Sequence, residues 1–324
     1  MIRAGLQIPR FNYAGVADAD LFARIATIAT TAEGAGFDSI WVMDHFYGLG
    51  RGGAPPTEPM LEAYTLLGGI AARASRVKLG TLVTGVTYHN PAHLAKEVTT
   101  LDIISSGRAI LGIGAAWYQL EHTGYGYDFP PIGERMNRLE EALQICRGMF
   151  TREETSFDGR YYRTERALNQ PRPLQPGGPP ILVGGQGETR LLRLVARYAD
   201  IWNFATGLGL GEIPRKLGVL ARHCEREGRD PATITKTGLR MLVIAPTQAA
   251  AESKGAALRA RLAMDGAAWR DQVLCGAPAT VAEQAQAYLD AGLDGLIVNL
   301  PIDVQDPEMV ALAGEALAGV PARA

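Results

Sequence analysis

Residues 77–127, VKLGTLVTGVTYHNPAHLAKEVTTLDIISSGRAILGIGAAWYQLEHTGYGY, are the stretch that decides the fold of this chain. The β-branched run VKLGTLVTG predicts a strand, and the polar loop after it leads to Pro91, which a first helical turn tolerates because proline lacks an N–H. Apolar residues at helical spacing from Leu94 to Ile104 predict a helix. A second apolar strand, RAILGIGA, then opens into another polar loop. In a parallel sheet both loops lie on the same side, which is where α/β barrels build their sites.

The same alternation of strand and helix continues along the whole chain. We predict strands at residues 3–8, 37–46, 77–85, 108–115, 179–185, 199–204, 235–245 and 292–301, and helices at 20–36, 60–74, 91–105, 134–150, 188–199, 211–228, 247–276, 280–291 and 307–318. Glu283, three residues after Thr280, predicts a capping box for the helix at 280–291. Eight repeats in 324 residues predict an α/β protein with a single (β/α)8 TIM barrel domain over residues 1–324, and fit a doubly wound open sheet less well. The aromatic and threonine content of residues 155–176, around Asp158-Gly159, predicts a hairpin inserted between the fourth helix and the fifth strand.

Composition limits the classes of partner. With 47% hydrophobic and 20% charged residues and a net charge of -2, the chain is typical of a globular protein and has no basic balance for nucleic acid or a membrane surface. No apolar run approaches the ~18 residues of a membrane helix, and the chain enters its first strand directly, so we expect no signal peptide. Cys146, Cys224 and Cys275 lack CxxC spacing, which argues against a disulfide framework or a zinc site. We therefore expect a cytoplasmic protein with a small-molecule substrate.

Candidate site residues follow the predicted strands. The strand ends are Gln7, Asp44-His45, Thr84–Asn90, Gly112–Tyr118, Gly184–Glu188, Asn203, Met241 and Asn299. No lysine closes a strand to form a Schiff base, and no GxSxG or Cys–His pattern is present. His89-x-x-x-His93 and Asp44-His45 could be imagined as metal ligands, but neither has a metalloprotease spacing, and we predict no metal. An apolar, glycine-rich lining is typical of a site for a flat ring system.

The segment GGQGETRLL, which begins at Gly184, is a candidate phosphate loop. Its glycines allow close backbone approach, and it leads into a helix N-terminus, where free N–H groups favour an anion. A tight βα turn explains the same glycines equally well. GIGAAW suggests a dinucleotide motif, but Trp117 stands where the third glycine would be, so we reject that interpretation.

Three stretches carry a resemblance to a known family: FDSIWVMDHF, residues 79–143 and PPILVGGQGETRLLRLVARYADIWNF, which together span roughly residues 37–204. They resemble the luciferase-like monooxygenase superfamily, specifically its deazaflavin (coenzyme F420)-dependent oxidoreductases. The resemblance implies a bacterial luciferase-like barrel, usually dimeric, that binds a flavin-type ring in its mouth. Coenzyme F420 is thus the expected cofactor, FMN is the alternative, and a homodimer is the expected assembly.

Cofactor-binding residues are implied by this resemblance, position by position. Asp44 and His45 match the place beside the ring and the substrate. Leu82, Val83, Thr84 and Gly85 match a bulge that backs the ring and often contains a non-prolyl cis peptide, and Asn90 follows it. Gly184, Gly185, Gln186, Gly187, Glu188 and Thr189 match the loop whose amides hold the cofactor's phosphate. The place of a proton-donating glutamate in some members is Ala116 in this chain.

His45 is the first candidate for catalytic proton transfer, because imidazole titrates near neutral pH. Asp44 could orient His45, although adjacent residues on a strand normally face opposite ways. His89 and Tyr118 are second candidates and His122 the third, with a surface position as the alternative for His122.

The substrate pocket is expected to include Gln7, Trp117, Tyr118 and Met241. The predicted function is hydride transfer between F420 and a small organic substrate. An FMN-dependent monooxygenase that uses oxygen and a non-catalytic flavin-binding carrier remain alternatives.

Overall fold

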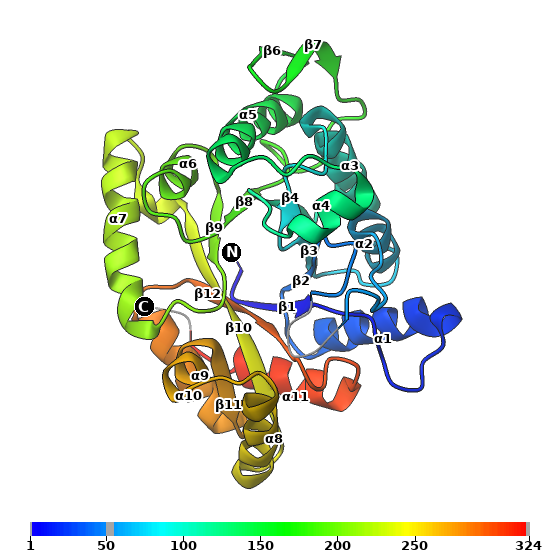
Figure 1. Ribbon diagram of the computed structural model, residues 1–324, viewed down its shortest axis with the longest axis vertical. Coiled ribbons are helices and arrows are strands. Elements are labelled where there is room, and N and C mark those ends of the chain that lie inside the picture. Colours follow the sequence, from blue (N-terminus) through cyan, green and yellow to red (C-terminus); the bar gives the residue numbers. More distant parts are fainter. Residues whose placement is uncertain (1, 50–54, 322–324) are drawn as a thin grey trace.

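Eight parallel strands close a barrel in the computed structural model, which describes residues 2–49 and 55–321 (Figure 1). Around the barrel the strands follow in the order β12, β1, β2, β3, β5, β8, β9 and β10, and β10 pairs with β12 to close it. Their bounds are β1 Ala4–Ile8, β2 Ser39–Val42, β3 Lys78–Thr81, β5 Ala109–Gly114, β8 Ile181–Gly184, β9 Ile201–Phe204, β10 Thr235–Ile244 and β12 Gly295–Asn299. The predicted (β/α)8 barrel is therefore confirmed.

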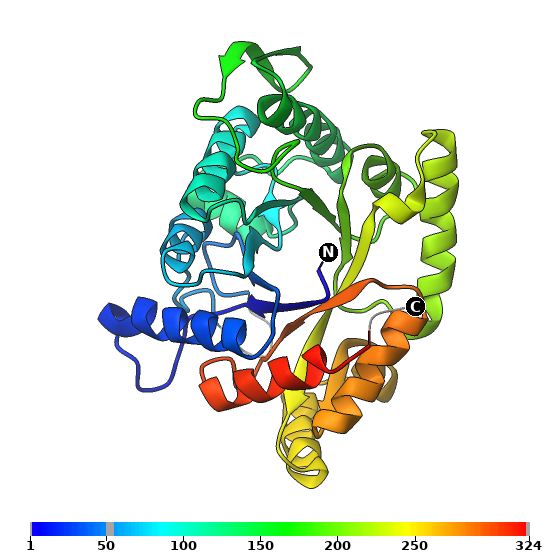
Figure 2. The same cartoon turned by 180° about the vertical axis from the view of Figure 1, so that it is seen from behind.

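Helices surround the barrel, as Figure 2 shows from behind. The long ones are α1 Leu21–Gly34, α2 Ala63–Ala71, α3 Pro91–Ile104, α5 Ile132–Thr151, α6 Leu191–Tyr198, α7 Ile213–Arg226, α8 Gln248–Arg261, α10 Pro278–Asp290 and α11 Pro307–Ala318. Two shorter helices are α4 Gln119–Tyr125 and α9 Gly266–Gln272, and 3-10 turns cover 18–20, 210–212 and 231–233. An antiparallel hairpin of β6 (Glu154–Asp158) and β7 (Arg163–Leu168) stands outside the barrel, beyond α5 and before β8.

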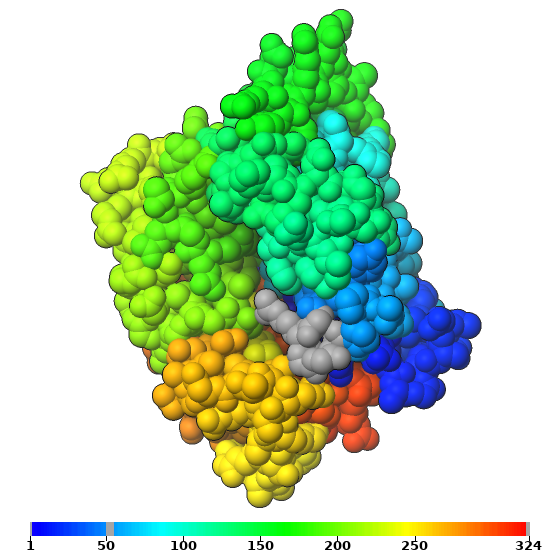
Figure 3. Space-filling model, in the orientation of Figure 1, coloured from blue at the N-terminus to red at the C-terminus, as the bar shows by residue number. Residues whose placement is uncertain are grey.

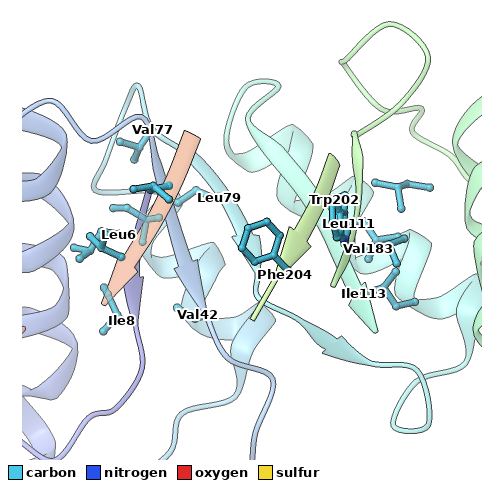
Figure 4. Packing of buried hydrophobic residues seen from close by; sticks show 14 of the residues in the cluster. Leu6, Ile8, Val42, Val77, Leu79, Leu111, Ile113, Val183, Trp202 and Phe204 are labelled. Atoms are coloured by element: carbon cyan, nitrogen blue, oxygen red, sulfur yellow. The ribbon is translucent and has the colours of Figure 1, made fainter. Parts of the chain in front are cut away.

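Side chains alternate between the two faces of each barrel strand, as the pleat requires. Leu6, Ile8, Ile113 and Val183 point toward the surrounding helices and join the main hydrophobic core (Figure 4). The intervening residues form a second cluster, made of Ile2, Trp41, Leu82, Ile110, Leu182, Ile201 and Ile297.

Two glycines make room for Trp41 in that second cluster. A Cβ on Gly5 or on Gly80 would lie 2.8 Å from the Trp41 ring. The indole is fully buried, and its Nε1 donates a hydrogen bond to Ser39 Oγ at 3.0 Å. Trp41 therefore occupies space that side chains at positions 5 and 80 would otherwise take.

Three predictions about elements were wrong. Residues 247–276 do not form one helix, because β11 (Val273–Gly276) pairs with Met241–Ile244 of β10, beyond the point where β9 stops pairing. The predicted loop after β5 contains α4. Helix α10 has no capping box, because it begins at Pro278 and the Thr280 hydroxyl donates to Gln248 instead.

Candidate functional site

A cavity of about 1200 Å³ opens at the carboxyl ends of the barrel strands. On the face seen in Figure 3, the molecule is hollowed between the green surface of α4 and α5 and the yellow-to-orange surface of α8 and α9. The residues predicted for the site that line the cavity are Gln7, Asp44, His45, Leu82, Val83, Gly85, Tyr88, Gly114, Ala115, Ala116, Trp117, Gly184, Gly185, Gly187, Glu188, Thr189, Asn203, Met241 and Asn299. Loops that are distant in the sequence therefore meet in one site large enough for a cofactor and a substrate.

The floor of the cavity is built around Val83. The Leu82–Val83 peptide bond is cis, and the two-residue strand β4 (Thr84–Gly85) resumes the pairing with β5 just after it. A Cβ on Gly114 or on Gly184 would lie 2.8 Å from a Val83 methyl group. The valine thus packs directly on two glycine backbones, and the floor is apolar and close to the main chain.

Asp44 holds the segment Leu82–Gly85, the bulge that follows β3, in place and is itself bonded to His89. Its carboxylate is buried and accepts hydrogen bonds from Gly85 N at 3.0 Å and from His89 Nε2 at 3.1 Å. His89 Nδ1 lies 3.4 Å from Glu97 Oε2. Burial disfavours the charged imidazole, but the hydrogen bond to Asp44 and the neighbouring Glu97 outweigh it and raise the pKa of His89 to about 10. His89 does not line the cavity, so it acts on the site through Asp44.

His45 has a carboxylate partner of its own, Glu121 of α4. Glu121 is fully buried and lies 2.8 Å from His45 Nδ1. It also accepts the backbone N–H groups of Phe46 at 2.6 Å and Tyr47 at 2.9 Å, and the Tyr88 hydroxyl at 2.9 Å. Burial opposes ionisation of Glu121, but the His45 hydrogen bond and the two amides prevail and lower its pKa. A charged Glu121 accepts only, so His45 Nδ1 carries the proton and Nε2 is the acceptor nitrogen.

The adjacent residues Asp44 and His45 thus belong to separate networks, and Asp44 does not orient His45. Trp117 covers His45 edge-on, with ring centroids 5.6 Å apart, and Trp117 is itself stacked on Tyr118 at 5.0 Å. Tyr118 does not line the cavity, and its hydroxyl donates to Gly48 O.

His122 is fully buried, so the surface position considered for it is wrong. Its Nδ1 lies 2.8 Å from the carbonyl oxygen of Tyr118, and its Nε2 lies 2.7 Å from the Thr87 hydroxyl. Since a carbonyl only accepts, Nδ1 donates and Nε2 accepts from Thr87. Burial lowers the pKa of His122, which fits a neutral ring that ties α4 to the β4–α3 loop and has no place on the cavity wall.

The glycine loop after β8 is anchored to β9. Gly185 N donates to Asn203 O at 2.9 Å, and Trp202 Nε1 donates to Gly185 O at 2.9 Å. Gln186 does not line the cavity, and its amide donates to Ala205 O at 3.0 Å. The backbone N–H groups of residues 186–189 have no acceptor anywhere in residues 2–49 or 55–321. Unpaired amides in front of a helix N-terminus are suited to hold an anion.

Glu188 places a carboxylate beside these amides, but two basic residues neutralise it. Lys216 Nζ lies 2.7 Å and Arg215 Nη1 lies 2.8 Å from Glu188 Oε1. Their hydrogen bonds lower the pKa of Glu188. The loop can therefore accept a further negative charge.

Of three further predicted residues, Thr84 and Asn90 lie away from the cavity wall and Gln7 lies on it. Thr84 is buried, and its hydroxyl pairs with those of Thr81 and Tyr64 at 2.7 Å. Asn90 caps α3 by accepting the N–H groups of residues 92 and 93, and it does not line the cavity. Gln7 lies on the cavity wall, where it donates to Leu82 O and accepts from Asn299.

Sequence reasoning missed Glu121, because α4 was taken for a loop. It also gave no role to Arg10 and Arg261, which line the cavity. The acidic residue in YQLEHTGY was the available signal for Glu121, but only a helix turns that residue toward His45.

Within the described part of the chain, no group of three or more histidine, cysteine or carboxylate side chains could hold a metal ion. The three cysteines are free, and no helix between residues 2 and 321, with 50–54 left aside, is long and apolar enough to cross a bilayer.

Comparison with known proteins gives matches over nearly the whole chain. A family model described as luciferase-like monooxygenase matches residues 4–295. The F420-dependent glucose-6-phosphate dehydrogenase of Kineococcus radiotolerans is 32% identical over 313 residues, which is 88% of this chain and 90% of the relative. The F420-dependent tetrahydromethanopterin reductase of Methanopyrus kandleri has the same fold, with a TM-score of 0.78 at 17% identity over 98% of both chains. An F420-dependent secondary alcohol dehydrogenase solved with an F420-acetone adduct gives 0.80 at 19% identity over 99% of both chains.

Proposed function

Because the chain belongs to the luciferase-like monooxygenase family, we propose that it is an F420-dependent oxidoreductase that moves a hydride between coenzyme F420 and a small organic substrate. The observation that carries the proposal is the glycine loop, whose unpaired amides at residues 186–189 stand across the cavity mouth from the β1 end. The relatives of this chain that are named as F420-dependent dehydrogenases support the choice of cofactor.

The residues present fit this cofactor. The apolar floor formed by Leu82, Val83 and Gly85 suits one face of a flat ring, and the buried Asp44 fixes that floor. The loop Gly184–Thr189 would hold the phosphate through its free amides. When bound, the deazaflavin supplies a ring carbon that accepts or donates a hydride.

His45 would handle the proton that accompanies the hydride. Its Nδ1 donates to Glu121, so Nε2 presents a lone pair and has no partner among the described residues. When Nε2 takes up a proton, the imidazolium is stabilised by the buried carboxylate of Glu121. His45 then removes the proton from a substrate hydroxyl, or returns it to a carbonyl in the opposite direction.

Trp117, which is 49% exposed, and Met241 form apolar parts of the wall that can shield this exchange from water. We propose a cytoplasmic homodimer as the working form. The free cysteines fit a reducing compartment, and light scattering of the purified protein tests the assembly.

Equilibrium binding of F420 and, separately, of FMN tests the proposal. We expect micromolar F420 binding and no FMN binding. Gly187→Asp should abolish F420 binding, because it adds a negative charge beside the amides. Gly187→Ala is the matched control, since its Cβ would lie 3.5 Å from Leu191 Cβ, an ordinary contact. Tight FMN binding without F420 would instead make the protein a flavin monooxygenase, and binding of neither would reject both.

A further inference from the structure

The charged side chains that line the cavity are three carboxylates and three arginines, and not all of them have a partner. Its acidic residues are all engaged: Asp44 with His89 and the Gly85 amide, Glu58 with Asn12 Nδ2 at 3.2 Å, and Glu188 with Arg215 and Lys216. Arg190 is bonded to Gly133 O and to the Asn137 side chain.

Arg10 and Arg261 are the exceptions. Neither side chain makes a hydrogen bond or an ion pair with any residue in the described ranges 2–49 and 55–321. The Nε atom of Arg10 is in addition buried and has no acceptor. Two guanidinium groups that are always charged therefore line the same cavity without a bonded partner, while the carboxylate of Glu58 is bonded to the neutral Asn12.

Arg10 lies across the barrel mouth from the proposed phosphate loop, and Arg261 lies between them. Arg10 follows β1, and Arg261 ends α8, the helix after β10. In the strand order of the barrel, β2, β3 and β5 separate β1 from β8 and its glycine loop, whereas β12 alone separates β10 from β1 and β9 alone separates β10 from β8. The barrel mouth thus has one place for an anion at the glycine loop and a second on the side of Arg10.

We propose that this second place binds an anionic head group of the substrate, a phosphate or a carboxylate, through Arg10 and Arg261. The proposal rests on the proposed function, because it names the substrate class of that same site. His45 follows β2, next to β1, so a substrate held by the arginines can present a hydroxyl or carbonyl carbon to His45 Nε2.

The cavity also offers apolar and polar contacts to such a substrate. Leu258, Leu262, Met264 and Pro301 are among its lining residues, and Arg261 is exposed at its edge. A guanidinium fork binds carboxylate or phosphate with two parallel hydrogen bonds. Gln272 and Asn299 also line the cavity and can bind neutral hydroxyl groups of the same substrate.

One sugar scaffold with three head groups tests the proposal. The F420-loaded protein is titrated calorimetrically with glucose 6-phosphate, glucuronate and glucose, which present a phosphate, a carboxylate and no charge. We expect at least one charged form to bind tenfold or more tightly than glucose, and the better of the two identifies the head group. The preference should fall to less than threefold in Arg10→Gln and in Arg261→Gln. Arg259→Gln is the matched control, because Arg259 is exposed on the last turn of α8 and does not line the cavity.

The affinity for F420 is measured for every variant, because it separates a failure of the anion site from a failure of the proposed F420-dependent function. We expect it to change by less than twofold in Arg10→Gln and Arg261→Gln. Equal binding of the three ligands, or a charge preference that survives both substitutions, would overturn the anion site. A tenfold loss of F420 affinity in both variants would also overturn it, because the arginines would then serve the cofactor. If the wild-type protein does not bind F420, the proposed function is rejected. The charge preference is then measured on the cofactor-free protein, which tests the anion site by itself.

Discussion

Replacing Glu121 by glutamine should reverse the tautomer of His45. The carboxylate accepts four hydrogen bonds, from His45 Nδ1, the Phe46 and Tyr47 amides and the Tyr88 hydroxyl. The glutamine oxygen can keep the two amides, which bond to Oε1. Its NH₂ group then replaces Oε2 and faces Nδ1 and the hydroxyl as a donor. His45 Nδ1 must become an acceptor, so the ring proton moves to Nε2, the nitrogen that is needed as the base.

The structure gives the size of the effect. Two charge-assisted hydrogen bonds, about 1.5–3 kcal/mol each, are exchanged for neutral ones of about 0.5–1.5 kcal/mol. The exchange costs roughly 2–3 kcal/mol in total. If that energy is lost from the imidazolium formed during turnover, kcat falls roughly 30- to 140-fold at about 1.4 kcal/mol per factor of ten. The affinity for F420 should change by less than twofold, because Glu121 does not line the cavity.

The direct assay is the ¹⁵N spectrum of histidine-labelled protein, which reports the protonated nitrogen of each ring and needs no substrate. His45 should be protonated at Nδ1 in the wild-type protein and at Nε2 in Glu121→Gln. The solvent deuterium isotope effect on kcat should rise, because proton transfer becomes slower than hydride transfer. Glu141→Gln is the control, since Glu141 accepts three backbone N–H groups of residues 160–162, outside the site. An unchanged His45 tautomer with kcat within twofold of wild type would refute the reasoning.

Three further substitutions test the surrounding structure. His89 has a folded-state pKa of about 10 against about 6.5 unfolded, so its contribution to stability is complete below pH 6.5 and is lost as the pH rises toward 10. Urea unfolding at pH 6, 8 and 10 should show this decline in wild type and a flatter one in His89→Gln, and parallel curves would contradict it. Gly185→Ala should lower F420 affinity at least tenfold, because φ at this position is +138° and the new Cβ would lie 2.8 Å from Leu191 Cδ1; unchanged binding would be the contrary result. Gly80→Ala should reduce the free energy of unfolding by about 1–3 kcal/mol, because its Cβ would lie 2.8 Å from the Trp41 ring, and calorimetric melting checks this.

The barrel could be predicted because its signal is local. Each barrel strand is a short apolar or β-branched run followed by glycine or polar residues, and each helix has an apolar stripe. Strand β11 was missed because its four residues, Val273–Gly276, lie beside an alanine-rich window that favours helix. Its pairing with β10 is a tertiary contact that no propensity reports.

The site could be predicted only where the type of residue itself indicates its position. The glycines at 184 and 185 are such residues, because a Cβ at either position would lie 2.8 Å from a neighbouring side chain. Glu121 is not, because its partner His45 is 76 positions away and an acidic residue on a short helix is most often exposed. Arg10 and Arg261 could not be predicted for another reason. They differ from the other charged residues of the cavity because their side chains have no partner among the described residues, and only the folded structure shows this.

The dipeptide Asp44-His45 explains how the floor and the reactive group of the site can be set independently. Residues next to each other on extended backbone point to opposite sides, so the two side chains leave the end of β2 in different directions. Asp44 turns toward Gly85 and fixes the bulge that forms the floor. His45 turns toward Glu121 on α4, which sets its tautomer. Each ionisable group thus has a partner of opposite character, His89 for Asp44 and Glu121 for His45. The protein can therefore tune the base through α4 without moving the surface on which a ring would lie.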